Sequence, residues 1–156
     1  MQHFYLLMSV DKESNIKTLN NVAVEYFALG MQNVSYQIWD ELYHEIQCNA
    51  PDYEKFLPVI SCNMGNMLRQ TGYYEEAYHV LVQGLRRCFD TGSIYALPEL
   101  LMQLSLIKVC LNNTQKADSM YSFSKHILQW SRHADTGQSI EDLMEQDFLL
   151  YCEDIK

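Results

Sequence analysis

The stretch NMGNMLRQTGYYEEAYHVLVQGL, Asn63 to Leu85, decides the fold. It reads as two amphipathic helices joined by a tight turn, with Gly65 inside the first helix, Gly72 at the turn and Ala77 inside the second. A glycine inside a helix costs about 1 kcal/mol relative to alanine. Close approach of the second helix compensates, because a missing side chain lets two helices bury more apolar surface against each other. The stretch therefore predicts a helical hairpin in which Gly65 faces Ala77.

The pattern of this hairpin recurs along the chain, with Gly30 before Gly72 and Asn112 after it at nearly equal spacing. Glycine and asparagine are the residues that best tolerate the left-handed conformation at the end of a helix. The other recurring positions are a proline near the start of the first helix and a small residue after the turn: Pro58 and Pro98; Ser35, Ala77 and Ala117. The segments 49–52 and 89–99 separate the hairpins.

The repeats predict an all-α fold of seven or so helices. We expect three hairpins, over residues 16–48, 58–89 and 98–130, in one domain that spans residues 1–156. A last amphipathic helix is expected over 139–153, where it would cover the exposed face of the third hairpin.

The segment from Ile60 to Leu85 resembles a tetratricopeptide repeat. Gly65, Gly72 and Ala77 match that family's pattern, while Leu68 stands where an aromatic residue is usual. The other two copies match at the following positions: Ala23, Tyr26, Gly30 and Ser35; Ser105, Lys108, Asn112 and Ala117. The resemblance implies a right-handed superhelical stack of about three hairpins plus the C-terminal capping helix. The spacing of the copies exceeds the usual period of that family, so the helices or linkers are expected to be longer.

Composition excludes several classes of protein. The chain has 156 residues, of which 48% are hydrophobic, so it can build a core and is not a disordered segment. It carries 11 basic and 20 acidic side chains, a net charge of −9, and no basic stripe. Nucleic-acid affinity depends largely on Lys and Arg, so we expect no direct binding of nucleic acid.

The five cysteines are odd in number, widely spaced and without a Cys-x-x-Cys pair, at Cys48, Cys62, Cys88, Cys110 and Cys152. This usage is typical of free thiols in a reducing compartment. No apolar run is long enough to span a membrane, and the first ten residues do not resemble a secretory signal. A cytoplasmic protein without membrane contact is expected.

The sequence carries no enzyme signature. Its five histidines lack zinc-ligand spacing and no glycine-rich phosphate loop occurs. A chance pairing of a cysteine with a histidine is left open. We expect no catalytic residue, no metal site and no cofactor.

By the resemblance, the first helix of each hairpin lines an extended concave surface. The peptide-binding residues that this implies are Asn20, Phe27, Asn66, Arg69, Gln70, Met102 and Leu106. The amides would pair with peptide backbone groups, apolar side chains would hold a peptide side chain, and Arg69 would bind a carboxylate. Alternatively, Arg69 is tied to a carboxylate of its own chain, with Glu99 as the candidate.

A non-enzymatic module that binds a peptide or protein partner is therefore the leading interpretation, and homodimer formation stays open. The long-period repeats also resemble the peptide-sensing domains of Rgg- and PlcR-type transcriptional regulators. Such regulators carry an N-terminal helix-turn-helix domain, which cannot be placed in this sequence. That alternative implies a regulatory domain without its DNA-binding part.

Overall fold

The computed structural model describes residues 11–113, 120–122 and 124–125. Its helices are α1 (Lys12–Ala28), α2 (Gln32–Asn49), α3 (Leu57–Gln70), α4 (Tyr74–Thr91) and α5 (Leu97–Cys110), with a short 3₁₀ helix, η2 (Pro51–Phe56), before α3. No strand occurs within these residues, and the predicted all-α class is confirmed. The predicted capping helix over 139–153 and most of the second helix of the third hairpin lie outside the described residues.

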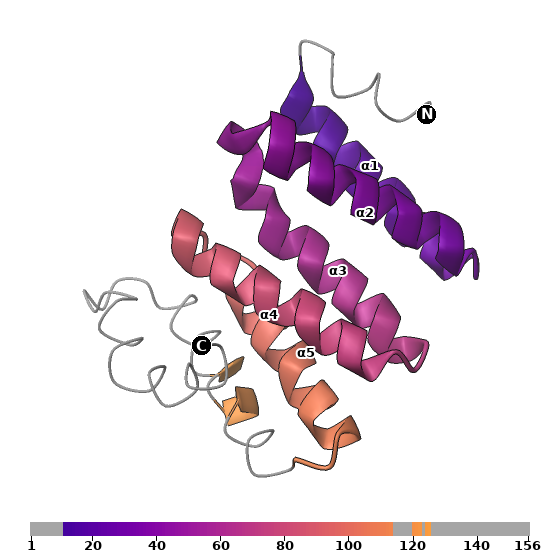
Figure 1. The fold of residues 1–156 in the computed structure, drawn as a ribbon, viewed down its shortest axis with the longest axis vertical. Coiled ribbons are helices and arrows are strands. Elements are labelled where there is room, and N and C mark those ends of the chain that lie inside the picture. The colour runs from indigo at the N-terminus through magenta and orange to yellow at the C-terminus, as the bar shows by residue number, and fades with distance from the viewer. Residues whose placement is uncertain (1–10, 114–119, 123, 126–156) are drawn as a thin grey trace.

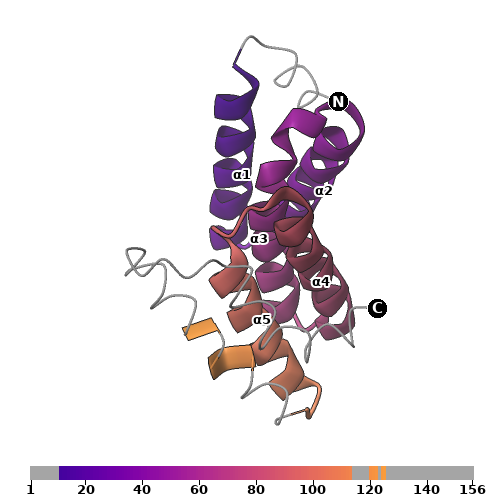
Figure 2. The same cartoon turned by 90° about the vertical axis from the view of Figure 1, so that its left-hand side faces the viewer.

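The helices pack as successive antiparallel neighbours. α1 contacts α2, α3 contacts α4, and α5 contacts both α3 and α4. Figure 2 shows α1, α3 and α5 following one another along one side of the molecule, with α2 and α4 on the other side. Figure 1 shows the same helices from the side on which α2 and α4 lie nearest the viewer. None of the described helices is both long enough and apolar enough to cross a membrane.

The three turns have the same backbone geometry. Gly30, Gly72 and Asn112 have φ angles of 78°, 88° and 61°, in the left-handed region. At each turn the following residue donates its amide to a carbonyl five positions earlier: Met31 to Tyr26 at 2.8 Å, Tyr73 to Leu68 at 2.9 Å, and Asn113 to Lys108 at 2.7 Å. These bonds satisfy carbonyls that the helix end leaves unpaired. The predicted turns at Gly30, Gly72 and Asn112–Asn113 are thereby confirmed.

Gly65 marks a close crossing of α3 and α4, as predicted, but the residue it faces differs. A Cβ atom added to Gly65 would meet the side chain of Leu81, with Cδ2 only 2.5 Å away. Leu81 is fully buried. The prediction that Gly65 faces Ala77 is therefore corrected to Leu81, one helical turn further along α4. The pattern locates the crossing, whereas the rotation of α4 about its axis decides which side chain fills it.

The corresponding crossing of α1 and α2 uses small residues and a hydrogen bond. Ala23 and Ser35 are both fully buried, and Ser35 Oγ donates to the Ala23 carbonyl oxygen at 2.6 Å. Because the hydroxyl has a backbone acceptor, its burial carries no unpaired polar group.

A second close approach in the α3–α4 hairpin involves Gly84. A Cβ on Gly84 would lie 2.6 Å from Ser61 Cβ and 3.0 Å from Leu100 Cδ2. Gly84 therefore lets α4 pass close to α3 and to α5 at one point. The core runs without a break through these crossings, with its largest fully buried side chains including Trp39, Leu42, Ile46, Leu57, Ile60, Leu85 and Leu100.

Candidate functional site

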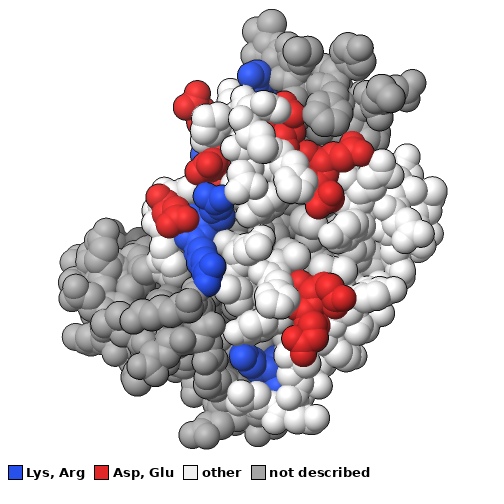
Figure 3. All heavy atoms as spheres, viewed as in Figure 1, with Lys and Arg blue, Asp and Glu red and all other residues white. Residues whose placement is uncertain are grey.

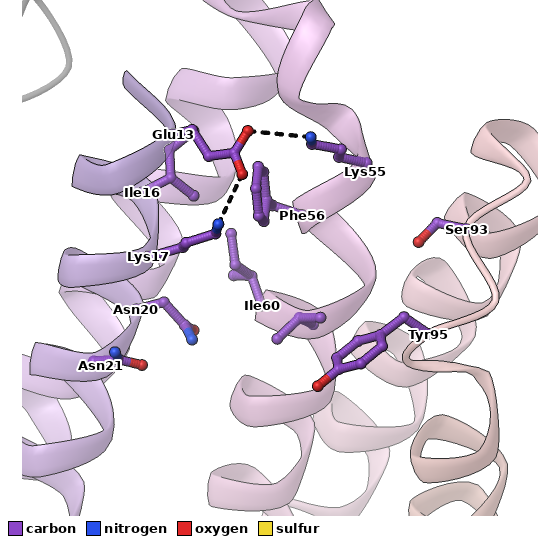
Figure 4. Close-up of a pocket in the computed structure, with 11 residues that line it drawn as sticks. Glu13, Ile16, Lys17, Asn20, Asn21, Lys55, Phe56, Ile60, Ser93 and Tyr95 are labelled. Atoms are coloured by element: carbon purple, nitrogen blue, oxygen red, sulfur yellow. Dashed lines mark hydrogen bonds and ion pairs between the residues drawn. The ribbon is translucent and has the colours of Figure 1, made fainter. Parts of the chain in front are cut away.

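A cavity of about 480 Å³ lies between α1, the junction of η2 and α3, and the loop that joins α4 to α5 (Figure 4). Its apolar floor consists of Ile16, Phe56, Val59 and Ile60. The two isoleucines are only 1% exposed, so they belong to the core as well as to the cavity. Across from them stands Tyr95, which is 86% exposed and comes from the α4–α5 loop.

The rim of the cavity carries two lysines that share one carboxylate. Lys17 Nζ lies 2.7 Å from Glu13 Oε1, and Lys55 Nζ lies 3.2 Å from Glu13 Oε2. Hydrogen bonds from Lys17 and Lys55 hold the pKa of the Glu13 carboxyl below its usual value. Both ammonium groups also lie over the Phe56 ring, at 5.8 and 5.1 Å from its centre. Two cations against one anion leave the rim with an excess of positive charge, on a chain whose net charge is −9.

Asn20 lines the same cavity and has a fixed orientation. Its Oδ1 accepts from Trp39 Nε1 at 3.0 Å and from Asn63 Nδ2 at 2.9 Å. The indole N–H can only donate, so the oxygen of the Asn20 amide must face Trp39. The Nδ2 group is then left on the other side, and it has no acceptor among the described residues. The cavity thus contains a preoriented amide donor.

Three of the predicted residues form a second polar network on α3. Arg69 Nη2 and Gln70 Nε2 both donate to Asn66 Oδ1 at 3.0 Å. Asn66 and Arg69, three residues apart, therefore lie on the same side of this helix. Arg69 Nε also donates to Gln103 Oε1 at 3.0 Å, and Gln103 Nε2 donates to Glu99 Oε1 at 3.1 Å. Arg69 is therefore joined to Glu99 through the buried amide of Gln103, and the network ties α3 to α5.

The other predicted residues lie apart from the cavity. Phe27 packs half-buried against the core, Met102 is half-buried, and Leu106 is 39% exposed on α5. Of the seven predicted residues only Asn20 lines the 480 Å³ cavity. The sequence analysis missed Lys55 and Phe56 because the segment between the first two hairpins was interpreted only as a break. It missed Glu13, at the start of α1, because nothing in the sequence links that residue to Lys55.

A second cavity, of about 550 Å³, lies between α2 and α4 with α3 beneath it. Its lining carries two acidic and two basic side chains, Asp40, Asp90, Arg86 and Arg87. Arg87 Nη1 lies 3.9 Å from Asp90 Oδ2 and from Oε2 of Glu54, which is outside the lining. A hydrogen bond with Tyr43 contributes most to raising the pKa of Arg87. Figure 3 shows the acidic and basic side chains of the face it draws in small separate groups. The lining of this cavity therefore lacks the excess of positive charge found at the rim of the first.

The two buried cysteine thiols are unreactive at neutral pH. Burial raises the pKa of both Cys62 and Cys88 to about 12, so they stay protonated at neutral pH and are poor nucleophiles. Within the described part of the chain, no group of three or more His, Cys, Asp or Glu side chains is placed to hold a metal ion.

Comparison with protein-family models, with curated proteins and with solved structures gave no match to this chain. What the cavity can bind is therefore inferred from its own side chains.

Proposed function

We propose that this chain is a non-enzymatic module that binds a peptide, or an extended segment of a partner protein, in the cavity beside α1. The observation that carries the proposal is the amide of Asn20. Trp39 and Asn63 hold its oxygen, so its nitrogen offers N–H donors to a carbonyl oxygen in the cavity. A peptide backbone supplies such acceptors at regular intervals, and the volume is within the usual range for ligand sites.

The apolar floor supports the same proposal. Ile16, Phe56, Val59 and Ile60 offer a surface for one or two peptide side chains beside the amide. Binding sites typically combine such a floor with a few fixed polar groups. The polar groups of this cavity are amides, hydroxyls and the lysine–glutamate cluster at the rim. None of these side chains forms a nucleophile–base pair within the described residues, which favours binding over catalysis.

A longer segment would continue along the side formed by α1, α3 and α5, which Figure 2 displays. On that side α3 carries the amides of Asn66 and Gln70, and α5 carries the exposed Leu106. We assign Arg69 to the contact between α3 and α5, because two of its N–H groups are already bound to Asn66 and Gln103.

The test is the substitution Asn20→Asp, measured against a library of fluorescein-labelled hexapeptides by anisotropy. Aspartate keeps an acceptor oxygen for Trp39 and for Asn63, removes the free N–H donor and adds one negative charge. We expect the wild type to bind a subset of the library and the variant to bind that subset about 10-fold more weakly, with an unchanged thermal melt.

A charge-matched control is Gln83→Glu, on an exposed position of α4 that lines the second cavity. It adds the same negative charge away from the site and is expected to leave binding unchanged. Equal affinities for the wild type and the Asn20→Asp variant, or no binding by any library member, would contradict the proposal.

A further inference from the structure

The glutamate at the rim of the cavity lies between two lysines. Glu13 comes from the first turn of α1 and lies between Lys17, on the same helix, and Lys55, which η2 brings from a distant part of the chain. Figure 4 shows the three side chains grouped around the Phe56 ring. The geometry is that of two ammonium groups closing on one carboxylate.

The carboxylate of Glu13 can be replaced by another carboxylate at low cost. The side chains of Lys17, Lys55 and Glu13 are 58%, 54% and 41% exposed, and ion pairs at such exposure contribute little to stability. A second carboxylate can therefore replace that of Glu13 without a large cost to the fold. The excess positive charge of the rim favours the exchange.

The groups below the rim decide what accompanies that carboxylate. Phe56 lies directly beneath the two ammonium groups, and Ile60 continues the apolar floor. On α1, Asn20 stands three residues after Lys17, hence on the same face of the helix. A ligand that fits has its carboxylate at the rim, an apolar group within a few bonds of it on the floor, and a carbonyl near Asn20. The last residue of a peptide with an apolar side chain has all three.

We propose that Glu13 is an internal competitor for the C-terminal carboxylate of a bound peptide. In the free protein it occupies Lys17 and Lys55. In the complex the peptide's terminal carboxylate takes its place, and the apolar side chain of the last residue packs on Phe56 and Ile60. This inference rests on the proposed peptide binding, and it adds the chemistry of the peptide's end together with a residue that limits affinity.

Charge-removing substitutions distinguish a competing Glu13 from one with only a structural role. Removing the charge of Glu13 frees both lysines and should strengthen binding, whereas removing the charge of Lys55 should weaken it. If the three residues only held α1 to η2, neither substitution would depend on the form of the peptide's C-terminus.

The experiment uses fluorescein-labelled Gly-Ser-Gly-Ala-Leu with a free C-terminal carboxylate, the same peptide as its amide, and Gly-Ser-Gly-Asp-Leu amide. The last peptide carries its acid on a side chain and so separates the two sources of a carboxylate. At low salt we expect the free acid to bind about 10-fold more tightly than either amide. Glu13→Gln should tighten binding of the free acid about 3- to 10-fold, and Lys55→Gln should weaken it about 10-fold.

The matched control is Glu25→Gln, near the other end of α1, where the side chain is exposed. It changes the net charge by the same amount as Glu13→Gln and should leave all affinities unchanged. Thermal melts of each variant verify folding.

Three outcomes overturn the inference. The first is equal binding of acid and amide, both weakened by Asn20→Asp, which leaves the proposed peptide binding intact. The second is weaker binding of the acid by Glu13→Gln. The third is no binding of the free acid at millimolar concentration, even by Glu13→Gln. Failure of the proposed function is recognised separately, by a hexapeptide library in which no member depends on Asn20.

Discussion

The two complete hairpins of this chain solve the same packing problem in different ways. In the α1–α2 hairpin, Ser35 is small enough for a close crossing, and its hydroxyl donates to the Ala23 carbonyl oxygen. In the α3–α4 hairpin, Gly65 and Gly84 remove side chains altogether, and Leu81 fills the space beside Gly65. Ser61, beside Gly84, is fully buried, and its Oγ has no hydrogen-bond partner among the described residues. Two hairpins with the same turn geometry thus cross through different chemistry, a hydrogen-bonded serine in one and glycines in the other.

The largest effect is expected where the second hairpin has no spare room. Gly65→Leu would drive a side chain into the buried Leu81, and we expect a loss of about 3 kcal/mol in unfolding free energy. Chemical denaturation measures it. Val24→Leu, at an exposed site on α1, serves as the control for adding bulk to a helix. A Gly65→Leu variant as stable as the control would show that no close crossing exists there.

Next comes the contact between α3 and α5, which relies on Arg69. Arg69→Ala removes one of the two donors to Asn66 Oδ1, which keeps Gln70 Nε2, and it removes the donor to the buried Gln103 Oε1. A loss of about 1.5 kcal/mol is expected, because both acceptors lose charged partners. Peptide affinity at the α1 cavity should stay the same. Unchanged stability together with weaker peptide binding would instead return Arg69 to the binding surface.

The first hairpin should respond to the loss of one hydroxyl. Ser35→Ala keeps the small size of the residue and deletes the bond to the Ala23 carbonyl. We expect a loss of about 1 kcal/mol in unfolding free energy. Thr18→Ala, at an exposed position of α1, is a control for removing a hydroxyl. An effect no larger than that of the control would mean that the buried bond contributes nothing.

The smallest expected effect has the opposite sign and sharpens the contrast between the hairpins. Ser61→Ala removes a buried hydroxyl that finds no partner in the described part of the chain, so the variant should be as stable as the wild type or more stable by about 0.5 kcal/mol. Denaturation curves of Ser61→Ala and Ser35→Ala, recorded side by side, test the pair. Equal losses in the two variants would remove the distinction between the crossings.

Features that depend on neighbours in sequence were predictable. The turns at Gly30, Gly72 and Asn112 follow from residue types that tolerate a positive φ, so their positions could be read directly. The neighbour of Gly65 could not, because a small residue indicates a close approach without specifying the rotation of the opposite helix.

The candidate site depends on contacts between distant parts of the chain and was predictable only in part. Asn20 was named because the family resemblance implies that the first helix of the hairpin lines a concave surface at this position. The cluster of Glu13, Lys17 and Lys55 was not found. Lys55 lies in η2, between the hairpins, and it pairs with Glu13 at the start of α1, so the contact joins the beginning of the first hairpin to the segment that follows it. Helical periodicity carries no information about such pairs.

The hydrogen bond between Trp39 and Asn20 gives the protein an optical reporter of its own. The indole is 1% exposed, and its only polar atom is bound to the amide that lines the cavity. Indole emission responds to changes in its immediate electrostatic surroundings. A carbonyl that binds to Asn20 changes the polarisation of that amide. The hydrogen bond from Trp39 Nε1 to Asn20 Oδ1 couples this change to the indole ring. Occupancy of the cavity can therefore be followed as a shift in the fluorescence of Trp39, with the Trp130→Phe variant used to isolate the signal and no dye attached.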